Sequence, residues 1–305
     1  MRVEWMGYHL KSGEAPEDAV RRLTQEQIER TISEIESEDA NLCDLVHQVR
    51  RRFKKIRGLL RLIRDSVGEV AYRRENCRFR HLGRVFAPLR DAQVRVQTFD
   101  ELQRRFPAVL RQPALADLRR RLESDREATR RGLMDRADVL DKVCFDLREA
   151  SERVREWRLE GDGFSIFAPG LRRVYRRGRK RFRRSLANPS PGHFHEWRKQ
   201  TRYLWCHLKI LRPCWSPVLL AWAGSCSKLI GQLGESHDLS SLCSYILGAG
   251  VGRERTREEL VRLADRRQAA LCRPLFALGA RIYAERPGDY VERLHAYWLA
   301  WSQRG

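Results

Sequence analysis

The sequence lacks several patterns that would assign it to common functional classes. Its eight cysteines include no CxxC pair and no Cys/His cluster of zinc-finger spacing, which gives little support to a metal or redox motif. No segment approaches about 18 uninterrupted apolar residues, and residues 1–20 hold no apolar run before a cleavage site. We therefore expect a soluble, unexported, cytoplasmic protein with reduced and mostly buried thiols. A disulfide or metal site at Cys206 and Cys214 stays open as an alternative.

Strand patterns are nearly absent as well. No alternating Val, Ile and Thr run is bounded by hairpin turns, whereas Leu, Arg, Glu and Ala recur at helical spacing almost throughout. The sequence therefore predicts an all-α fold of roughly ten helices. Gly, Pro and polar residues cluster where these helices should end, at 66–68, 106–113, 161–169, 188–192, 213–217, 248–252 and 286–288.

Acidic residues are few relative to basic ones. The chain of 305 residues has 61 Lys plus Arg against 40 Asp plus Glu, a formal net charge of +21. Such an excess repels itself in a compact state and is usually kept to bind something negative, such as nucleic acid, a membrane surface or polyphosphate. An RNP-type aromatic motif, a helix-turn-helix and paired zinc ligands are all missing. Sequence-specific recognition of nucleic acid therefore has little support.

An internal repeat is the most informative pattern. The segments LVHQVRRRFKKIRGLLRLIR and HFHEWRKQTRYLWCHLKILR align at an offset of 148 residues, which places His47 on His195. A second landmark repeats at nearly the same offset, because Asp91 follows His47 by 44 residues and Asp238 follows His195 by 43. The repeat predicts a duplicated unit, and hence two pseudo-symmetric helical bundles.

Each repeated segment separates charge from apolar residues when it is drawn as a helix. In the first, His47, Arg50, Arg51, Lys54, Gly58 and Arg61 fall within roughly a 100° arc, and the opposite side carries Leu45, Val46, Val49, Phe53, Ile56, Leu60 and Ile63. In the second, His195 and its basic neighbours oppose Trp197, Leu204, Leu208 and Leu211. We expect one face to pack and the other to carry charge.

A third basic stripe follows in LRRVYRRGRKRFRRSL. Arg172, Arg176, Arg179 and Arg183 share one track, with Arg173, Arg177, Lys180 and Arg184 on a track beside it. Gly178 interrupts this helix, as Gly58 interrupts the first histidine helix, and we expect neighbouring helices to approach closely at both.

A charged helix face is ordinarily just solvated surface, and this interpretation stays open for any single stripe. The two histidine stripes nevertheless have no acidic partner at i+4, although mixed signs would stabilise a merely soluble helix. Like charges one turn apart recur twice in one chain. A rigid helix offers a basic group about every 5.4 Å, which suits a ligand with charge repeated along its length. Arginine forks bind phosphate oxygens in bidentate fashion, which favours a phosphate chain.

These motifs resemble the CHAD family, the helical domain named for its histidines. The family pattern HxxRxxxRRxR is similar to His47, Arg50, Lys54, Lys55 and Arg57, and its variant second copy to His195, Trp197, Arg198, Lys199, Arg202 and Lys209. Tyr203 and Trp205 depart from the pattern, where many members are basic, so we expect a weaker second face. LRDAQV, with Arg90 and Asp91, and LGESHDL, with Gly234, His237 and Asp238, resemble the paired aspartate motifs of the family.

The resemblance implies a fold and a function. It implies two four-helix-type bundles, residues 1–160 and 161–305, around a shared basic central groove. It also implies non-catalytic binding of inorganic polyphosphate at polyphosphate granules, without cofactor or metal. A polyphosphate-metabolising enzyme and a non-specific architectural nucleic-acid binder, with weak binding of nucleic acid, remain the alternatives; no membrane partner is expected, and the oligomeric state is left open.

The expected polyphosphate contacts lie on all three stripes. They are His47, Arg50, Arg51, Lys54, Arg57, Arg61, Arg176, Arg179, Arg183, His195, Arg198, Lys199, Arg202 and Lys209. Asp91 and Asp238 are expected to orient either a basic residue or the histidine of their own half, because a carboxylate that faced phosphate would be repelled. No catalytic residue is expected, since no carboxylate cluster that could hold Mg²⁺ is evident.

Overall fold

The computed structural model describes residues 7–37, 41–107, 113–135, 137–249 and 254–303. Over these ranges the chain forms helices and no strand, which confirms the all-α prediction. The α-helices are α1 (Pro16–Ile35), α2 (Leu42–Leu62), α3 (Glu69–Val85), α4 (Ala87–Arg105), α5 (Pro113–Met134), α6 (Ala137–Arg155), α7 (Ala168–Ala187), α8 (Pro191–Ile210), α9 (Ser216–Ala249), α10 (Glu254–Ile282) and α11 (Pro287–Ser302). Two short 3-10 helices, η2 (Gly163–Ile166) and η3 (Arg212–Trp215), precede α7 and α9.

The helix ends follow the local sequence signals. Pro stands at the first or second position of several helices, including α7 and α8, where its missing N–H costs nothing. The side chain of Asn41 accepts hydrogen bonds from the backbone N–H groups of Cys43 and Asp44, and it thereby caps α2. Three of the breaks between the described helices were not predicted: those between α1 and α2, between α5 and α6, and between α3 and α4. At the last of these, around Phe86, the local signal is weak, because no glycine directly precedes Phe86 and only Pro88 follows it.

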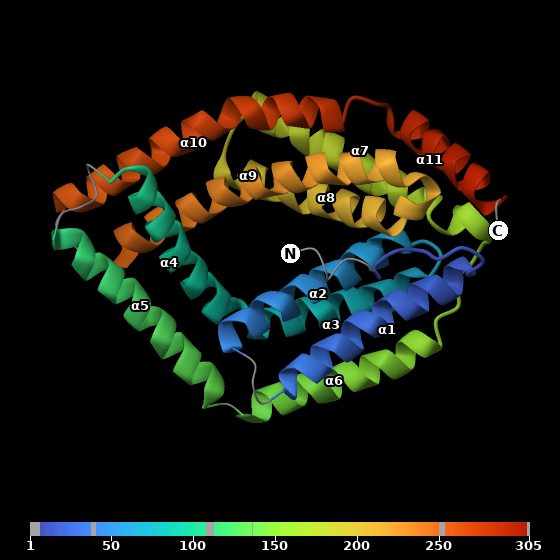
Figure 1. Ribbon diagram of the computed structural model, residues 1–305, viewed down its shortest axis with the longest axis horizontal. Helices are drawn as coiled ribbons and strands as arrows, with labels where there is room; N and C mark the ends of the chain where they lie inside the picture. The colour runs from blue at the N-terminus through green and yellow to red at the C-terminus, as the bar shows by residue number, and fades with distance from the viewer. Residues whose placement is uncertain (1–6, 38–40, 108–112, 136, 250–253, 304–305) are drawn as a thin grey trace.

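The helices lie in two groups (Figure 1). In that view α1, α2, α3 and α6 lie together below α7 to α11, while α4 and α5 flank both groups at one end. The predicted boundary at residues 160 and 161 falls in the connection between α6 and α7. The duplication and the pseudo-symmetry of two bundles stay a prediction.

Two clusters of buried apolar side chains hold the helices together. The larger one joins both groups, from Val46 and Phe53 on α2 to Trp197 and Leu204 on α8. The smaller one lies between α4, α5, α9 and α10 and includes Phe99 and Leu242. Each residue assigned to the packing faces of α2 and α8 is buried, which confirms the amphipathic pattern. On α7 Ser185 is buried while Leu186 is exposed.

Glycines mark where helices cross closely. A Cβ atom on Gly58 would lie 2.8 Å from the Sγ atom of Cys206, so α2 and α8 touch at this point. The imidazole of His207 lies on the same contact, with its Nε2 atom 3.1 Å from the carbonyl oxygen of Gly58. A Cβ atom on Gly178 would lie 2.5 Å from the ring of Tyr283. Both close approaches had been predicted.

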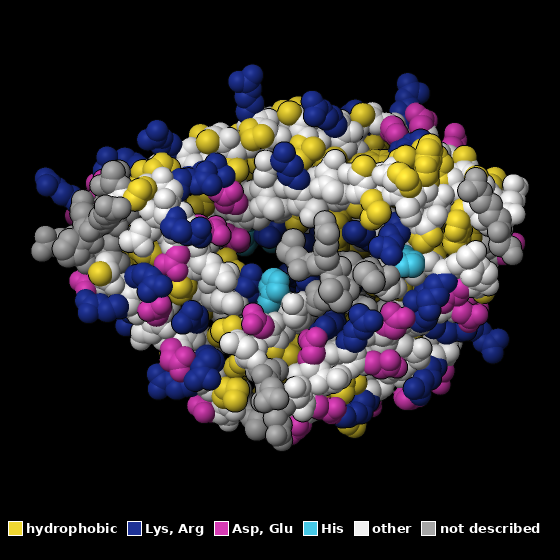
Figure 2. Space-filling model, viewed as in Figure 1, with side chains coloured by type: hydrophobic (Ala, Val, Ile, Leu, Met, Phe, Trp, Pro, Cys, Tyr) yellow, Lys and Arg dark blue, Asp and Glu magenta, His cyan; other side chains and the backbone are white. Residues whose placement is uncertain are grey.

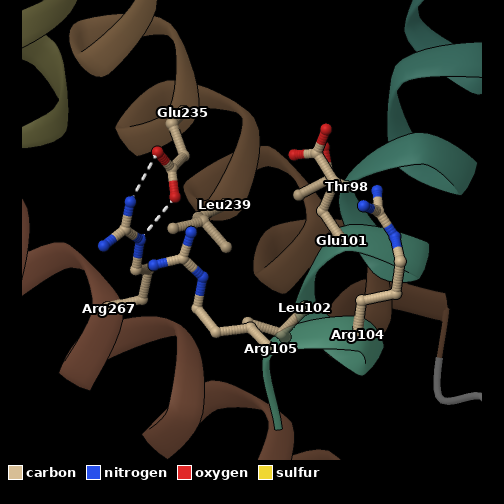
Figure 3. Close-up of a pocket in the computed structure, with 8 residues that line it drawn as sticks. All are labelled: Thr98, Glu101, Leu102, Arg104, Arg105, Glu235, Leu239 and Arg267. Atoms are coloured by element: carbon tan, nitrogen blue, oxygen red, sulfur yellow. Dashed lines mark hydrogen bonds and ion pairs between the residues drawn. The ribbon is translucent and has the colours of Figure 1, made fainter.

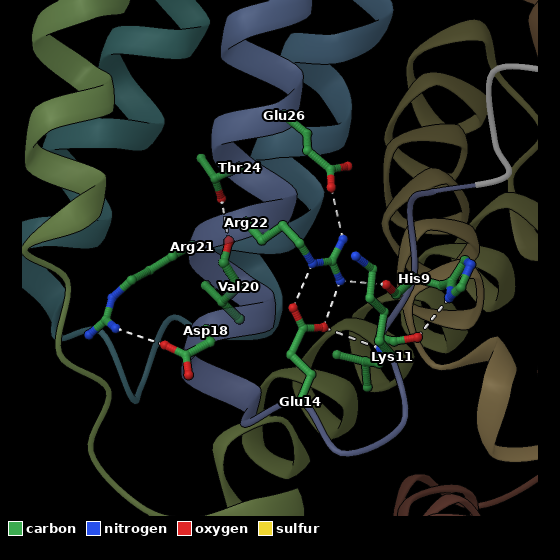
Figure 4. Close-up of polar contacts among 10 residues, drawn as sticks. His9, Lys11, Glu14, Asp18, Val20, Arg21, Arg22, Thr24 and Glu26 are labelled. Carbon is green, nitrogen blue, oxygen red and sulfur yellow. Dashed lines mark hydrogen bonds and ion pairs between the residues drawn. The ribbon is translucent and has the colours of Figure 1, made fainter.

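The segment before α1 connects the two groups of helices. The Tyr8 hydroxyl donates to the carbonyl oxygen of Lys55 on α2 at 2.9 Å, and the Leu10 N–H donates to the carbonyl oxygen of Ile210 on α8 at 3.1 Å. Arg22 on α1 anchors the same segment, since its guanidinium donates to the Glu14 carboxylate at 2.5 and 2.7 Å (Figure 4). This segment therefore contacts α1, α2 and α8 at once.

The cysteines and the helix lengths add two observations. All eight cysteines are free, Cys206 and Cys214 included. Among the described residues, no helix combines the length and the apolar character needed to span a bilayer.

The contact between α2 and α7 can be tested at Gly170. A Cβ atom there would lie 1.9 Å from the carbonyl oxygen of Leu62, a backbone atom that cannot swing aside. We expect Gly170→Ala to lower the free energy of unfolding by about 3 kcal/mol, measured by urea denaturation. Gly132→Ala on α5, where a Cβ atom would meet open space, should raise it by about 0.5 to 1 kcal/mol. Equal effects at the two positions would contradict the close contact.

Candidate functional site

Lys54 lies among basic side chains from three helices. Its neighbours are Arg50 on α2, Arg90 on α4, and Arg198 and Arg202 on α8. Burial, followed by the positive charges of these four arginines, lowers the pKa of Lys54 well below its usual value. We call these five residues the central cluster. The sequence repeat predicted that four of them, Arg50 and Lys54 on α2 and Arg198 and Arg202 on α8, bind the ligand. The structure brings these four together.

Carboxylates neutralise the central cluster only in part. None of its five members forms an ion pair with any residue that the structure describes. Burial lowers the pKa of Arg50 and of Arg198, and Asp91 and Asp238, respectively, oppose this effect. Burial lowers the pKa of Arg202 to about 10, with a further contribution from the charge of Arg198. Five cationic groups therefore share two nearby carboxylates.

The arginines of the cluster are held by backbone and small residues. The Nη1 atom of Arg50 donates to the carbonyl oxygen of Gly83 at the end of α3, at 2.6 Å. The guanidinium of Arg198 packs against Gly234 on α9, where a Cβ atom would lie 2.6 Å from its Nη2 atom. The Nε atoms of Arg50 and Arg198 are buried without a hydrogen-bond partner. Gly234, in the LGESHDL motif, thus leaves room for the guanidinium of Arg198, which belongs to the histidine helix α8.

The two predicted histidines occupy different surroundings. His47 is exposed near the start of α2. His195 is half-buried on α8, and its ring centre lies 5.0 Å from that of His237 on α9, whose Nδ1 atom is 3.2 Å from the Asp238 carboxylate. Burial, and then the charges of His237 and Lys199, lower the pKa of His195. His195 therefore belongs to a group with His237 and Asp238 beside Arg198.

Other predicted contacts on α2 and α8 lie outside the central cluster. Arg57 and Arg61 follow Lys54 at the next turns of α2 and are half-buried. Arg51 and Lys209 are also half-buried, and burial lowers the pKa of Lys209. Lys199 forms an ion pair with Glu196, one turn earlier on α8. The charge of Lys199 is therefore balanced within its own helix. A search for acids four residues after each base misses this pair, because Glu196 stands three residues before Lys199.

On α7 the structure brings the second basic track, and not the first, to α2. Arg177 lies close enough to Arg61 and Arg64 that their charges, after burial, lower its pKa, and Arg173 pairs with Asp65 at 2.7 Å. The expected residues differ: Arg176 and Arg183 are exposed, and Arg179 lies near Tyr175. The helical period separates the two tracks but does not show which of them faces α2.

Figure 2 shows a hollow near the middle of the molecule, with lysine and arginine side chains as well as acidic and histidine side chains along its edge. In Figure 1 the corresponding region lies between α2, α4 and α9. A cavity of about 540 Å³ lies farther along α4, between α4, α9 and α10 (Figure 3). Its charges are mixed, because Arg267 there pairs with Glu235 at 2.5 and 2.9 Å and Glu101 also contributes. Among the described residues, no group of three or more His, Cys, Asp and Glu side chains is arranged to hold a metal ion.

The surroundings of His195 can be tested by titration. We expect NMR to give His195 a pKa below its ordinary value of 6.5. His237→Gln should raise this pKa, because it removes the neighbouring imidazole, but burial should keep it below the ordinary value. A His195 pKa above 6.5 in the unmodified protein, or no response to His237→Gln, would contradict this arrangement.

Comparison with known proteins agrees with the geometry. No curated protein sequence matches the chain. The family model of the CHAD domain matches residues 24–245, a range that contains the histidine helices α2 and α8 and both aspartate motifs. Since this range covers well over half of the sequence, the chain is a member of the CHAD domain family.

Proposed function

We propose that this protein binds inorganic polyphosphate, without catalysis, through the central cluster and the basic stripe of α2. The supporting observation is the position of Lys54, an amine among four arginines from three helices with two carboxylates nearby. Membership of the CHAD family is consistent with polyphosphate as the ligand. We also expect such a binder to associate with polyphosphate granules in the cytoplasm.

The energetics of the cluster favour an anionic ligand. Five like charges that are partly withdrawn from water repel one another, and each loses hydration. A phosphate chain would reverse both effects, since its oxygens accept charge-assisted hydrogen bonds and its charge compensates the cations. The helices already hold the side chains in place, so little conformational freedom is lost on binding.

A linear ligand fits better than a compact one. Arg50, Lys54, Arg57 and Arg61 recur every three or four residues along α2, and two arginines of α8 lie near Lys54. Such a row presents positive charge at each turn, about 5.4 Å apart. The repeating phosphates of polyphosphate supply negative charge at every unit. In this proposal Asp91 and Asp238 orient Arg50 and Arg198, as the sequence suggested.

The proposal can be tested by removing charge from the cluster. We expect Arg50→Gln combined with Arg198→Gln to weaken polyphosphate binding by about a hundredfold or more, because two charge-assisted contacts are lost. Binding is measured by calorimetry at fixed salt. The fold should survive, since fewer buried like charges remain. Arg262→Gln on α10, where this arginine is exposed, is the matched control and should bind as the unmodified protein does.

Three results would overturn the proposal. The first is that the unmodified protein does not bind polyphosphate. The second is that double-stranded DNA displaces bound polyphosphate at equal charge concentration, which would favour the architectural nucleic-acid binder. Phosphate release or a change in chain length on incubation with Mg²⁺ and nucleotide would favour an enzyme. All three functions share a steep salt dependence, so salt alone does not separate them.

Binding should strengthen as the pH falls. The pKa of His195 is lowered in the protein without ligand, and a nearby polyanion should raise it. The complex then takes up a proton, so affinity rises as the pH falls through the pKa of the complex and levels off below that of the unbound protein. Each unit between the two pKa values adds about tenfold. His195→Gln should remove this dependence between mildly acidic and neutral buffer; a pH-independent affinity of the unmodified protein would contradict it.

A further inference from the structure

The basic stripe of α2 continues past the central cluster. Arg57 and Arg61 follow Lys54 on α2 at intervals of three and four residues, and Arg64 lies in the turn that follows the end of the helix at Leu62. Arg50, Lys54, Arg57 and Arg61 fall within an arc of about 60° on α2, and Arg50 and Arg61 are about 16 Å apart along the helix axis. The stripe is therefore straight, and Arg61 lies about two turns past Lys54, beyond a short ligand that is centred on the central cluster.

Two neighbouring helices add cations to this far half. Arg80 on α3 lies close enough to Arg57 to lower its pKa, although burial has the larger effect. On α7, burial lowers the pKa of Arg177, and the charge of Arg61 is among the nearby charges that add to this effect. The side chain of Asn76 on α3 accepts hydrogen bonds from Arg57 at 3.2 Å and from Arg61 at 2.9 Å, which holds both guanidinium groups on this side. We call Arg57, Arg61, Arg80 and Arg177 the outer cluster.

Tyr203 connects the outer cluster to the central one. The guanidinium carbon of Arg61 lies 4.0 Å from the centre of the Tyr203 ring, a cation–π contact. Tyr203 is buried and directly follows Arg202 on α8. The departure from the family pattern at this position therefore does not simply remove a charge, because the ring supports an arginine of the other histidine helix.

Acidic residues mark the end of the stripe. Arg64 pairs with Glu69 at 2.8 and 3.0 Å, and Arg173 pairs with Asp65 at 2.7 Å. Within the part of the chain that the structure describes, none of the four arginines of the outer cluster forms an ion pair. The cations without a carboxylate partner thus run from the central cluster to the outer one and stop at Asp65 and Glu69.

We propose that the outer cluster is a second segment of the binding site, which engages phosphates that extend beyond the central cluster and so makes the protein select long linear polyphosphate over short oligophosphates. This inference rests on the proposed function. A tripolyphosphate is too short to contact both ends of this row at once, because Arg50 and Arg61 are about 16 Å apart along the helix axis. A long chain contacts both and gains the additional charge contacts.

The experiment compares ligand lengths in one double variant. We expect Arg80→Gln combined with Arg177→Gln to weaken the binding of long-chain polyphosphate about tenfold, since two exposed phosphate contacts are lost, and to change tripolyphosphate binding less than twofold. Both side chains are exposed, so the substitutions should not cost stability, and circular dichroism during heating checks this. Arg80→Lys combined with Arg177→Lys keeps both charges and should retain most of the long-chain affinity. Arg262→Gln is again the control.

The outcomes separate this inference from the proposed function. If the Gln double variant binds long chains as tightly as the unmodified protein, while Arg50→Gln with Arg198→Gln weakens both ligands, the outer cluster is not part of the site and the proposed function stands. Equal losses for tripolyphosphate and long chains would also overturn the inference, because the two clusters would then act as one. If the unmodified protein binds neither ligand, the proposed function itself fails.

Discussion

The contact between α2 and α8 at Gly58 and Cys206 determines the rest of the site. Only a residue without a side chain allows the two helices to approach so closely, and the contact between His207 and the carbonyl oxygen of Gly58 fixes how they meet. Both helices carry a cationic stripe, so their approach places Lys54 beside Arg198 and Arg202. A larger residue at position 58 would separate the stripes and dissolve the cluster without removing any charge.

This arrangement costs free energy that the apolar core offsets. The larger apolar cluster runs continuously through both groups of helices and buries large aromatic side chains such as Trp197 and Phe53. Ion pairs are placed around the cationic stripe and seldom on it, as with Arg52 and Glu34 on the opposite side of α2. The molecule therefore combines a conventional helical core with one region where charge balance is left incomplete.

The sequence predicted faces of helices well and the partners of those faces poorly. Periodicity alone identified the buried sides of α2 and α8, and the glycines within the helices indicated the close approaches at Gly58 and Gly178. It could not choose between the two arginine tracks of α7, because that choice depends on which neighbour packs where. Arg90 was visible in the LRDAQV motif, but only the fold places it beside Lys54. Asn76 and Arg80 carried no signal, since a single helix does not show what lies across from it.

The segment before α1 has a consequence for how the chain reaches this structure. Its backbone N–H at Leu10 pairs with Ile210, a residue that the ribosome adds 200 positions later. Early helices can pack against one another during synthesis, but this connection waits until α8 has emerged. Closing so large a loop is slow compared with forming local helical contacts. The two groups of helices are thus joined late, by a backbone segment that is synthesised 200 residues before its partner on α8.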